Sequence, residues 1–404
     1  MRKLLCFIIL FICIGAVSAQ QTYTITGIVT DDKDAPIPGA TVFIGDSRKV
    51  TASDSEGRFT FTQMRPGNYN VVVKMIGYEI LQHAFMLQNK DAKFRFKLQE
   101  SNEMLNTVEI NAMSLAERKR LLAIFMECFL GRSKNAAQCK ILNTDDIKLR
   151  FDKKNNILTA NSSEFLIIEN KALGYRMKYL LNNFLYDRSI GNNLIFFDGT
   201  LFFEDMKGNP RQQKKWDVER VTTYLGSVPH YYRSLFSNTL EENGFLTYVV
   251  PNPKSFNSKA ILNPDMLLKY FMPVGDLKRY IKDVDDNFKS FNLGLLTKDS
   301  TELYVLYTPK NEPADFKERG NVVYRAFKMP AGQLSIIRPT ADSLLISRSG
   351  DITPVNSILF VGFWGWGQAA AFLPSDYMIP AGMEPPKIPK KAEATVGPLP
   401  KVGN

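Results

Sequence analysis

Alternation of apolar and polar side chains dominates residues 21–100 of this chain. Apolar positions recur at every second residue over Tyr23–Val29, Tyr69–Met75 and Phe94–Leu98. A period of two turns one side of an extended segment toward a core and the other toward solvent. Short sequences rich in Asp, Gly, Pro and Asn separate these segments and are typical of turns. The pattern therefore predicts that residues 21–100 form an all-β sandwich of two sheets.

The pattern that follows has helical periodicity and defined ends. Ser114 and Glu117 have the spacing of a capping box, and Gly131 follows the last apolar position as a stop signal. The sequence therefore predicts an amphipathic helix, whose buried face would carry Leu115, Leu122, Phe125 and Phe129.

Beyond this helix, extended apolar runs alternate with turn signals as far as residue 380. They predict an antiparallel sheet, with hairpin turns at 153–156 and at Asp198-Gly199. Helical periodicity interrupts the sheet over residues 209–242, with a break at Leu225–Ser227, and a short helix is expected at 264–270. Residues 114–380 are therefore predicted to form a second, larger α+β domain. Its expected strands are 147–151, 157–159, 165–168, 175–186, 194–197, 200–203, 246–250, 303–307, 334–337, 344–347 and 358–363.

Three further stretches have the composition of segments that lie outside domains. Residues 1–19 combine a positive start, an apolar run shorter than a membrane-spanning helix and small residues before Gln20, which predicts a cleaved secretory signal peptide. We therefore expect an exported protein of the periplasm or cell envelope, with no transmembrane helix in the mature chain. Residues 101–113 are expected to be a linker, and the Pro- and Lys-rich residues 381–404 a disordered tail.

The chain is basic, with 51 Lys and Arg against 41 Asp and Glu and a net charge of +10. The two signs are interleaved along the sequence, which is typical of a solvated surface rather than of a nucleic-acid-binding patch. We therefore expect no nucleic-acid partner. Peripheral association with the anionic surface of an outer membrane is left open by this charge.

The cysteines divide between the expected signal peptide and the mature chain. Cys6 and Cys13 belong to the former, which leaves Cys128 and Cys139 in the latter. In an oxidising compartment, two cysteines separated by a short loop are expected to form a structural disulfide. Such a bond would stabilise a local segment by about 3 kcal/mol in the chain-entropy description.

Several motifs of residues 21–100 occur in the order found in one known family. They are Gly27–Asp31, Ala35–Val42, Gly57–Phe59, Arg65–Gly67 and Gly77-Tyr78. On these motifs the segment resembles the carboxypeptidase-regulatory-like domain, which implies a transthyretin-like β-sandwich. The resemblance also implies a place at the front of an envelope protein of Bacteroidota, where such domains are common.

Residue types needed by several common chemistries are scarce. His83 and His230 are the only histidines of the chain, and neither has a Glu or a second His at metal-ligand spacing. The chain is therefore not expected to be a metallocarboxypeptidase despite its front domain, and neither a metal nor another cofactor is expected. The motifs of serine hydrolases, P-loop proteins and dinucleotide-binding proteins are also missing from the sequence.

One concentrated set of aromatic and cationic residues lies in the helical interlude. Trp216, Arg220 and Tyr224 follow at intervals of four, so a helix would place them on one face with Arg220 against the rings. After the break, His230 and Arg233 share a face of the next helix. A buried helix pair and a site for an anionic ligand, a glycan or a partner protein both explain such residues. The stretch resembles a segment of uncharacterised Bacteroidota proteins that carry the same front domain, which implies no known activity.

Two functional hypotheses follow. The first is a non-enzymatic binding or assembly protein of the periplasm or cell envelope, with an envelope protein or glycan as partner. The second is a hydrolase of envelope glycan or peptide that uses His230 or a pair of carboxylates as acid and base. The surroundings of His230 distinguish them. A solvent-accessible cleft beside an acidic or Ser side chain favours the hydrolase, whereas burial against Trp216 or Tyr224 removes it.

Overall fold

The computed structural model describes residues 21–101, 113–189, 194–249, 272–273, 277–295, 302–313, 316, 332–354 and 358–385. They divide into two compact units, the first made of described residues up to Val42 and of Val50–Asn102, the second of Phe43–Lys49 and the described residues that follow Glu103. The expected signal peptide, almost all of the expected linker, the helix at 264–270 and the tail after residue 385 lie outside the described residues. No described helix is long and apolar enough to cross a membrane.

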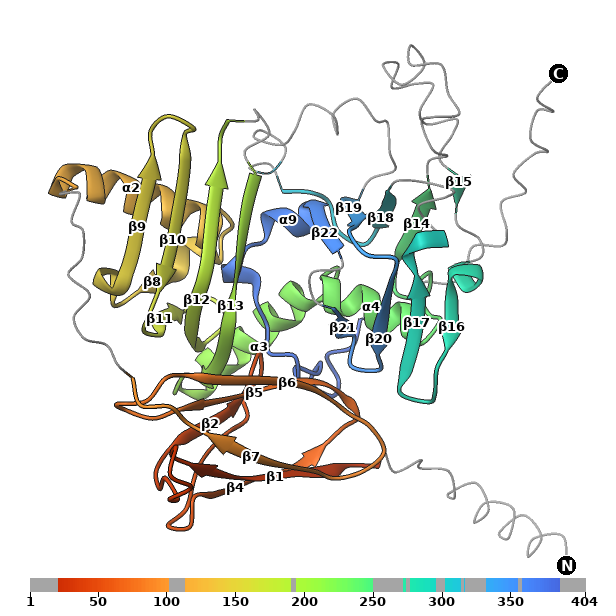
Figure 1. Cartoon of the computed structure of the whole chain (residues 1–404). Helices are drawn as coiled ribbons and strands as arrows, with labels where there is room; N and C mark the ends of the chain where they lie inside the picture. Colours follow the sequence, from red (N-terminus) through yellow and green to blue (C-terminus); the bar gives the residue numbers. More distant parts are fainter. Residues whose placement is uncertain are drawn as a thin grey trace, which may run out of the picture. The chain divides into compact units, whose positions relative to one another are not determined.

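Two sheets make up the first unit, and the all-β prediction for this region is confirmed (Figure 1). The first sheet has the order β4-β1-β7 and the second the order β3-β2-β5-β6. Strands β1 and β7 pair in parallel, whereas β1–β4 and β5–β6 are antiparallel. The strands are β1 (Tyr23–Thr30), β2 (Thr41–Ile44), β3 (Val50–Ala52), β4 (Arg58–Met64), β5 (Gly67–Lys74), β6 (Leu81–Leu87) and β7 (Ala92–Lys97).

Burial in the first unit follows the alternation of its sequence. In β1, Ile25, Gly27 and Val29 are buried, while Thr26 and Ile28 between them face outward and are partly exposed. Phe59 of β4 stacks on Phe96 of β7, with ring centroids 5.8 Å apart. A period of two in sequence thus becomes one core face per sheet, as expected for a sandwich.

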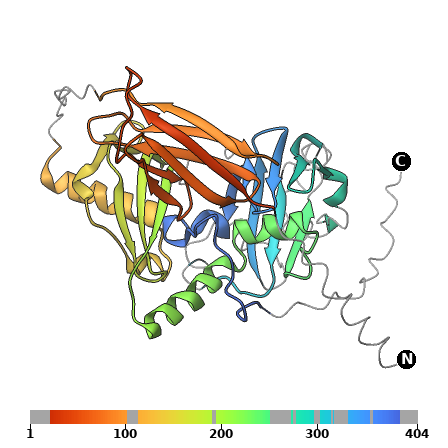
Figure 2. The same cartoon turned by 90° about the horizontal axis from the view of Figure 1, so that it is seen from below.

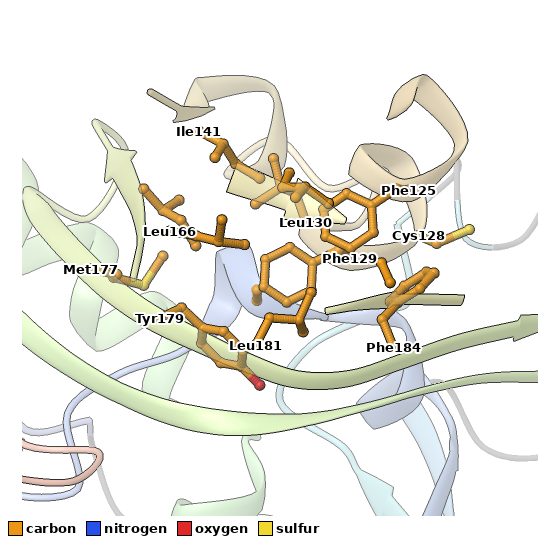
Figure 3. Packing of buried hydrophobic residues seen from close by; sticks show 14 of the residues in the cluster. Phe125, Cys128, Phe129, Leu130, Ile141, Leu166, Met177, Tyr179, Leu181 and Phe184 are labelled. Carbon is orange, nitrogen blue, oxygen red and sulfur yellow. The ribbon is translucent and has the colours of Figure 1, made fainter. Parts of the chain in front are cut away.

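The second unit begins with a helix packed on a six-stranded sheet. Figure 3 shows Phe125 and Phe129 of the helix beside Tyr179 and Phe184 of the sheet, and the centroid distances are 4.8 Å for Phe125–Phe184 and 5.2 Å for Phe129–Tyr179. The long strand β12 pairs with three neighbours, β10, β11 and β13, all antiparallel. The elements are α2 (Leu115–Leu130), η1 (Ala136–Gln138), β8 (Cys139–Ile141), η2 (Thr144–Asp146), β9 (Ile147–Asp152), β10 (Ile157–Ser162), β11 (Leu166–Asn170), β12 (Tyr175–Asp187) and β13 (Leu194–Asp205).

Two details of this region differ from the sequence-based expectation. Leu115, expected on the buried face of α2, is 88% exposed because the first helical turn extends past the residues that cover the rest of the helix. Asp198 and Gly199, expected in a hairpin turn, lie inside the single strand β13, opposite Asn183 and Leu181. A β-bulge in β12 between Leu181 and Asn183 allows the pairing with β13 to continue past this point. Asp198-Gly199 therefore lies opposite a bulge and does not form a turn.

The expected disulfide between Cys128 and Cys139 is wrong, because both are free thiols in the structure. Cys128 lies in the last turn of α2, at the margin of the core shown in Figure 3. Cys139 begins β8, and its thiol donates a hydrogen bond to the main-chain oxygen of Asn135 at 3.3 Å. The prediction rested on cysteine number, whereas a disulfide also needs the two Cβ atoms about 4 Å apart. Burial raises the pKa of Cys128 to about 11 and that of Cys139 to about 12.

Two helices lead from the six-stranded sheet to two smaller antiparallel sheets (Figure 2). The helices are α3 (Pro210–Tyr224) and α4 (Val228–Phe236), and their break falls at the predicted Leu225–Ser227. A second core lies under α4, around Tyr231, Phe245 and Phe291. One sheet has the order β15 (Met272–Pro273), β14 (Phe245–Val249), β18 (Leu303–Tyr307), β19 (Gln333–Pro339) and β22 (Ile358–Gly362), and the other the order β16 (Ile281–Asp283), β17 (Phe288–Asn292), β20 (Ser343–Ser347) and β21 (Ile352–Thr353). The short helices are η4 (Leu277–Tyr280), α9 (Phe363–Trp366) and η6 (Ala369–Ala371).

Candidate functional site

The ends of α3 and α4 are set by local hydrogen bonds. Asn209 and Gln212 form a reciprocal capping box at the start of α3. At the break, Gly226 has φ of +88°, and the Ser227 side chain accepts a hydrogen bond from the His230 main-chain N–H to begin α4. The ammonium of Lys310 donates to the main-chain oxygens of Thr222 and Leu225, which are left without helical partners at the end of α3. The end of α3 is therefore stabilised by Lys310 and the start of α4 by Ser227.

Trp216 covers the turn that leads into β12. Its indole Nε1 donates to the main-chain oxygen of Lys171 at 3.0 Å, and its side chain is 6% exposed. The ring lies so close to Gly174 that a Cβ there would meet it at 2.2 Å, and Gly174 also has φ of +68°. Only glycine satisfies both conditions, so Trp216 and Gly174 act as one packing unit.

Arg220 reaches the same turn with its guanidinium. Its Nε donates to the Leu173 oxygen at 2.7 Å, and Nη2 donates to the Gly174 oxygen at 3.2 Å and to Asp205 at 3.0 Å. The guanidinium also stacks on the ring of Tyr175, 3.9 Å from its centroid. The arginine was expected against Trp216 and Tyr224, but it lies on an aromatic residue from another element. Buried at 7% exposure, Arg220 ties α3 to the β11–β12 turn and to the end of β13.

His230 packs against the end of α3. Its ring lies 5.0 Å from that of Tyr224 and 4.9 Å from that of Phe245, and only 6% of the residue is exposed. Its Nδ1 accepts a hydrogen bond from the Gly226 N–H at 3.1 Å. Burial, together with the charges of Lys310 and Arg233, lowers the pKa of His230 to about 4. The imidazole is therefore neutral near pH 7 and serves as an acceptor for the helix break.

Arg233 connects α4 to two later segments of the second unit. Its guanidinium donates to the main-chain oxygens of Ser349 at 2.6 Å, Tyr377 at 2.8 Å and Ser375 at 2.9 Å. The guanidinium also lies over the ring of Tyr224, 5.3 Å from its centroid. Three carbonyl acceptors satisfy the forked geometry of arginine, which fixes residues 375–377 against α4.

The structure brings the five predicted residues together as two adjoining groups. Trp216 and Arg220 both donate hydrogen bonds to main-chain oxygens of the turn before β12, while His230 and Arg233 both contact Tyr224. All five contact other parts of the second unit, and their role in binding an external ligand stays a prediction.

Sequence analysis missed four partners of this segment: Gly174, Tyr175, Asp205 and Tyr377. Gly174 was not singled out, since nothing in the local pattern indicates which ring lies on it. Tyr377 is 5% exposed, and burial raises its pKa to about 12. The hydroxyls of Tyr175 and Tyr377 are buried without a hydrogen-bond partner among the described residues. Each partner comes from a distant part of the chain, which a local pattern does not reveal.

Two further candidates lie in the described part of the chain: His83, and the carboxylates of Asp46 and Asp351. Desolvation and the charge of Asp351 raise the pKa of Asp46 to about 7, and desolvation raises the pKa of Asp351. His83 lies on β6 with its ring exposed, 5.0 Å from the ring of Phe94 in an edge-to-face arrangement. Across the described residues, no three His, Cys, Asp or Glu side chains converge in a way that could hold a metal ion.

Comparison with known proteins assigns only the front of the chain. Residues 25–110 match the family model of the CarboxypepD_reg-like domain, so a carboxypeptidase-regulatory-like domain is present. No curated protein matches this chain.

Among solved structures, the likenesses are partial and weak. One is 3-chlorocatechol 1,2-dioxygenase from Rhodococcus opacus 1CP, with 12% identity and a TM-score of 0.18 over 20% of this chain and 62% of that one. Another is the pilus 2b backbone protein of group B streptococcus, with 16% identity and a TM-score of 0.19 over 21% and 43%. A third is a type II cohesin-X-dockerin complex from Acetivibrio cellulolyticus, with 21% identity and a TM-score of 0.19 over 24% and 71%. The match covers less than two thirds of the first two chains, and scores this low carry no argument about activity or partners.

Proposed function

We propose that this chain is a non-enzymatic binding or assembly protein of the periplasm or cell envelope, carrying a carboxypeptidase-regulatory-like domain at its front. One observation carries the proposal. The most concentrated set of cationic and aromatic side chains in the sequence is engaged inside the second unit, where Arg220 and Arg233 together contact five main-chain oxygens. Groups held in this way preorganise a framework for binding, and they are not available to act as mobile acids, bases or nucleophiles.

The front domain and the chain's start support an envelope setting. The CarboxypepD_reg-like domain at 25–110 is compatible with a non-catalytic role. By resemblance, such domains precede the functional part of envelope proteins of Bacteroidota. Residues 1–19 have the pattern of a secretory signal peptide, which would deliver the chain to that compartment.

The surroundings of His230 argue against the hydrolase alternative. A general acid or base must lie within hydrogen-bond reach of the substrate. His230 is buried against Tyr224, and its Nδ1 already accepts a hydrogen bond from Gly226. The carboxylate of Asp205 forms an ion pair with Arg220 of α3, at 3.0 Å. Neither group favours an acid–base role, so we propose no hydrolytic activity for this segment.

The proposal is tested by expressing the full chain with a C-terminal tag in a Gram-negative host. We expect a product whose first residue is Gln20, its recovery from the periplasmic or envelope fraction, and an envelope component enriched over a tagged, exported control protein. The His230→Gln variant serves as the matched control, because it should retain the same partner. A product that stays uncleaved in the cytosol would contradict the export, and no enriched component would contradict the binding role. Release of sugar or peptide from envelope material that His230→Gln abolishes would restore the hydrolase.

A further inference from the structure

The outward face of the β4-β1-β7 sheet carries a regular array of cations and threonines. Along β7, Lys93, Arg95 and Lys97 are all exposed and alternate with inward-facing Phe94 and Phe96. Successive outward side chains of a strand are about 6.6 Å apart, so the three cations form a straight, evenly spaced row.

The strand register extends this row across the whole sheet. Ile28 of β1 pairs with Arg58 of β4 on one side and with Arg95 of β7 on the other. Two residues earlier in β1, Thr26 pairs with Thr60 of β4 on one side and with Lys93 of β7 on the other. Cations therefore stand on both edge strands of the sheet, with threonines and Ile28 between them.

Charges on this face are unbalanced although the unit as a whole is neutral. Residues 21–42 and 50–102 contain eight Lys or Arg and eight Asp or Glu. Arg95 and Lys97 share the single carboxylate of Asp34, at 3.8 Å and 3.2 Å. Arg58 and Lys93 have no ionic partner in the described part of the chain. Four cations thus stand against two carboxylates, that of Asp34 and that of Asp91, which accepts a hydrogen bond from the Thr24 main-chain N–H at 2.8 Å.

Two of the acidic residues, Asp31 and Asp54, have their carboxylates engaged in turns. Asp31 accepts hydrogen bonds from the main-chain N–H groups of Lys33 and Ala35, and Asp54 accepts from those of Glu56 and Arg58. Asp residues are favoured in turns because their side chains can accept such bonds. Both carboxylates are therefore occupied by main-chain donors of their own turns.

A cationic edge strand by itself is a common protection against edge-to-edge aggregation. That explanation accounts for the cations on both edge strands, β7 and β4, but not for Thr26 and Thr60, which lie among them on the same face. A flat face that combines fixed cations with hydroxyl groups is suited to a ligand that carries both regularly spaced anions and hydroxyls. It is less suited to a membrane surface, because Ile28, itself partly buried, is the one apolar side chain among the paired outward positions and offers little area to insert.

We propose that this face, defined by Arg58, Lys93, Arg95 and Lys97 with Thr26 and Thr60, binds an acidic polysaccharide. The guanidinium and ammonium groups would contact the carboxylates of successive sugar units, and the threonine hydroxyls would hydrogen-bond to sugar hydroxyls. The sheet holds these groups at fixed spacing before binding, which reduces the ordering cost of association. The proposal goes beyond the role proposed above and does not depend on where the protein is located.

The test measures the affinity of the purified full chain for polygalacturonate at low ionic strength, with neutral dextran as the uncharged polymer. The double variant Arg58→Gln with Lys93→Gln should bind about fivefold more weakly, as expected when two exposed ionic contacts are lost. The matched control is Arg65→Gln with Lys90→Gln, which removes the same charge from exposed turn positions and should bind as the parent does. Added salt should weaken the parent's binding, because exposed ion pairs are screened.

Three outcomes would overturn the proposal. Equal losses in the two double variants would mean that overall charge, and not this face, governs binding. Binding of dextran as tight as that of polygalacturonate would remove the role of the anions. Stronger binding to vesicles of phosphatidylglycerol and phosphatidylcholine than to the polymer, lost in the Arg58 and Lys93 variant, would assign the face to lipid instead.

Discussion

Cationic side chains have opposite settings in the two units. In the first unit, Arg58 and Lys93 extend from a sheet face into solvent. In the second, the Arg220 side chain is 8% exposed, bonded to two carbonyls and one carboxylate and stacked on Tyr175. A charge buried in this way has lost its hydration, so it is stabilising only while all of its partners are present. We therefore expect that Arg58 can be replaced with little effect on stability, whereas replacement of Arg220 destabilises the second unit.

Removal of the buried arginine should have the largest effect. Arg220→Ala would leave two turn carbonyls without their donor and Asp205 with only Arg48, at 3.5 Å, as its cationic partner. We expect a loss of about 3–5 kcal/mol in the free energy of unfolding. The matched exposed change, Arg58→Ala, should shift it by about 0.5 kcal/mol or less. Urea unfolding followed by tryptophan fluorescence measures both. Similar losses in the two variants would break the comparison.

Glycine positions allow the next test, because Gly174 and Gly39 have similar positive φ values of +68° and +75°. An added Cβ would collide with Trp216 at Gly174, whereas at Gly39 nothing lies within 4 Å. Gly174→Ala should therefore cost about 3 kcal/mol, and Gly39→Ala about 1 kcal/mol from backbone strain alone. Thermal unfolding measures the difference. An equal cost at the two sites would mean that Trp216 is not packed on the turn.

Acid should destabilise the second unit through His230. Because the pKa of His230 is lowered to about 4 in the folded state, the unfolded chain takes up this proton more readily. Above pH 6.5 the imidazole is neutral in both states, so the stability is at its full value. As the pH falls from 6.5 toward 4, the free energy of unfolding decreases, and the decrease reaches about 2–3 kcal/mol at pH 4.5. Urea unfolding at pH 7 and pH 4.5 should show a smaller pH-dependent loss for His230→Gln than for the parent. A loss in His230→Gln as large as that in the parent would mean that burial of this imidazole does not set the pH dependence.

The smallest expected effect concerns the cysteines. Since Cys128 and Cys139 are free thiols, a reductant should leave the melting temperature of the mature chain unchanged. Their raised pKa values predict slow reaction with a thiol reagent in the folded state, and reaction of both after denaturation. Two results together would contradict this: no free thiols in the denatured chain before reduction, and a lower melting temperature after reduction. They would show that Cys128 and Cys139 form a disulfide.

Local pattern was sufficient for most of the elements but not for their partners. Strand β18 occupies the expected 303–307, and the helix break falls at the predicted Leu225–Ser227. The parallel pairing of β1 with β7 was not predictable, because alternation marks a buried side without indicating a neighbour. Asp198-Gly199 resembled a hairpin turn because the bulge that absorbs it belongs to the opposite strand.

The candidate segment shows the same division. Spacing placed Trp216, Arg220 and Tyr224 on one helix face correctly, and all three are buried. It could not indicate that Arg220 would stack on Tyr175, or that His230 would accept a hydrogen bond from Gly226. A helical period describes one surface of an element, whereas the contact also depends on the surface that meets it.

By itself, the sequence determined where most strands and helices lie, the all-β character of the front domain and which side of its strands would be buried. These features depend on backbone preferences and on the period of apolar residues, which act over a few neighbouring positions. Only the tertiary structure decided that Arg220 of α3 and Arg233 of α4 bind main-chain oxygens inside the second unit, while Arg58 of β4 and Arg95 of β7 remain exposed. The physical reason is desolvation: a cation is buried only where distant segments supply enough acceptors to replace its water, and those segments meet only in the folded chain.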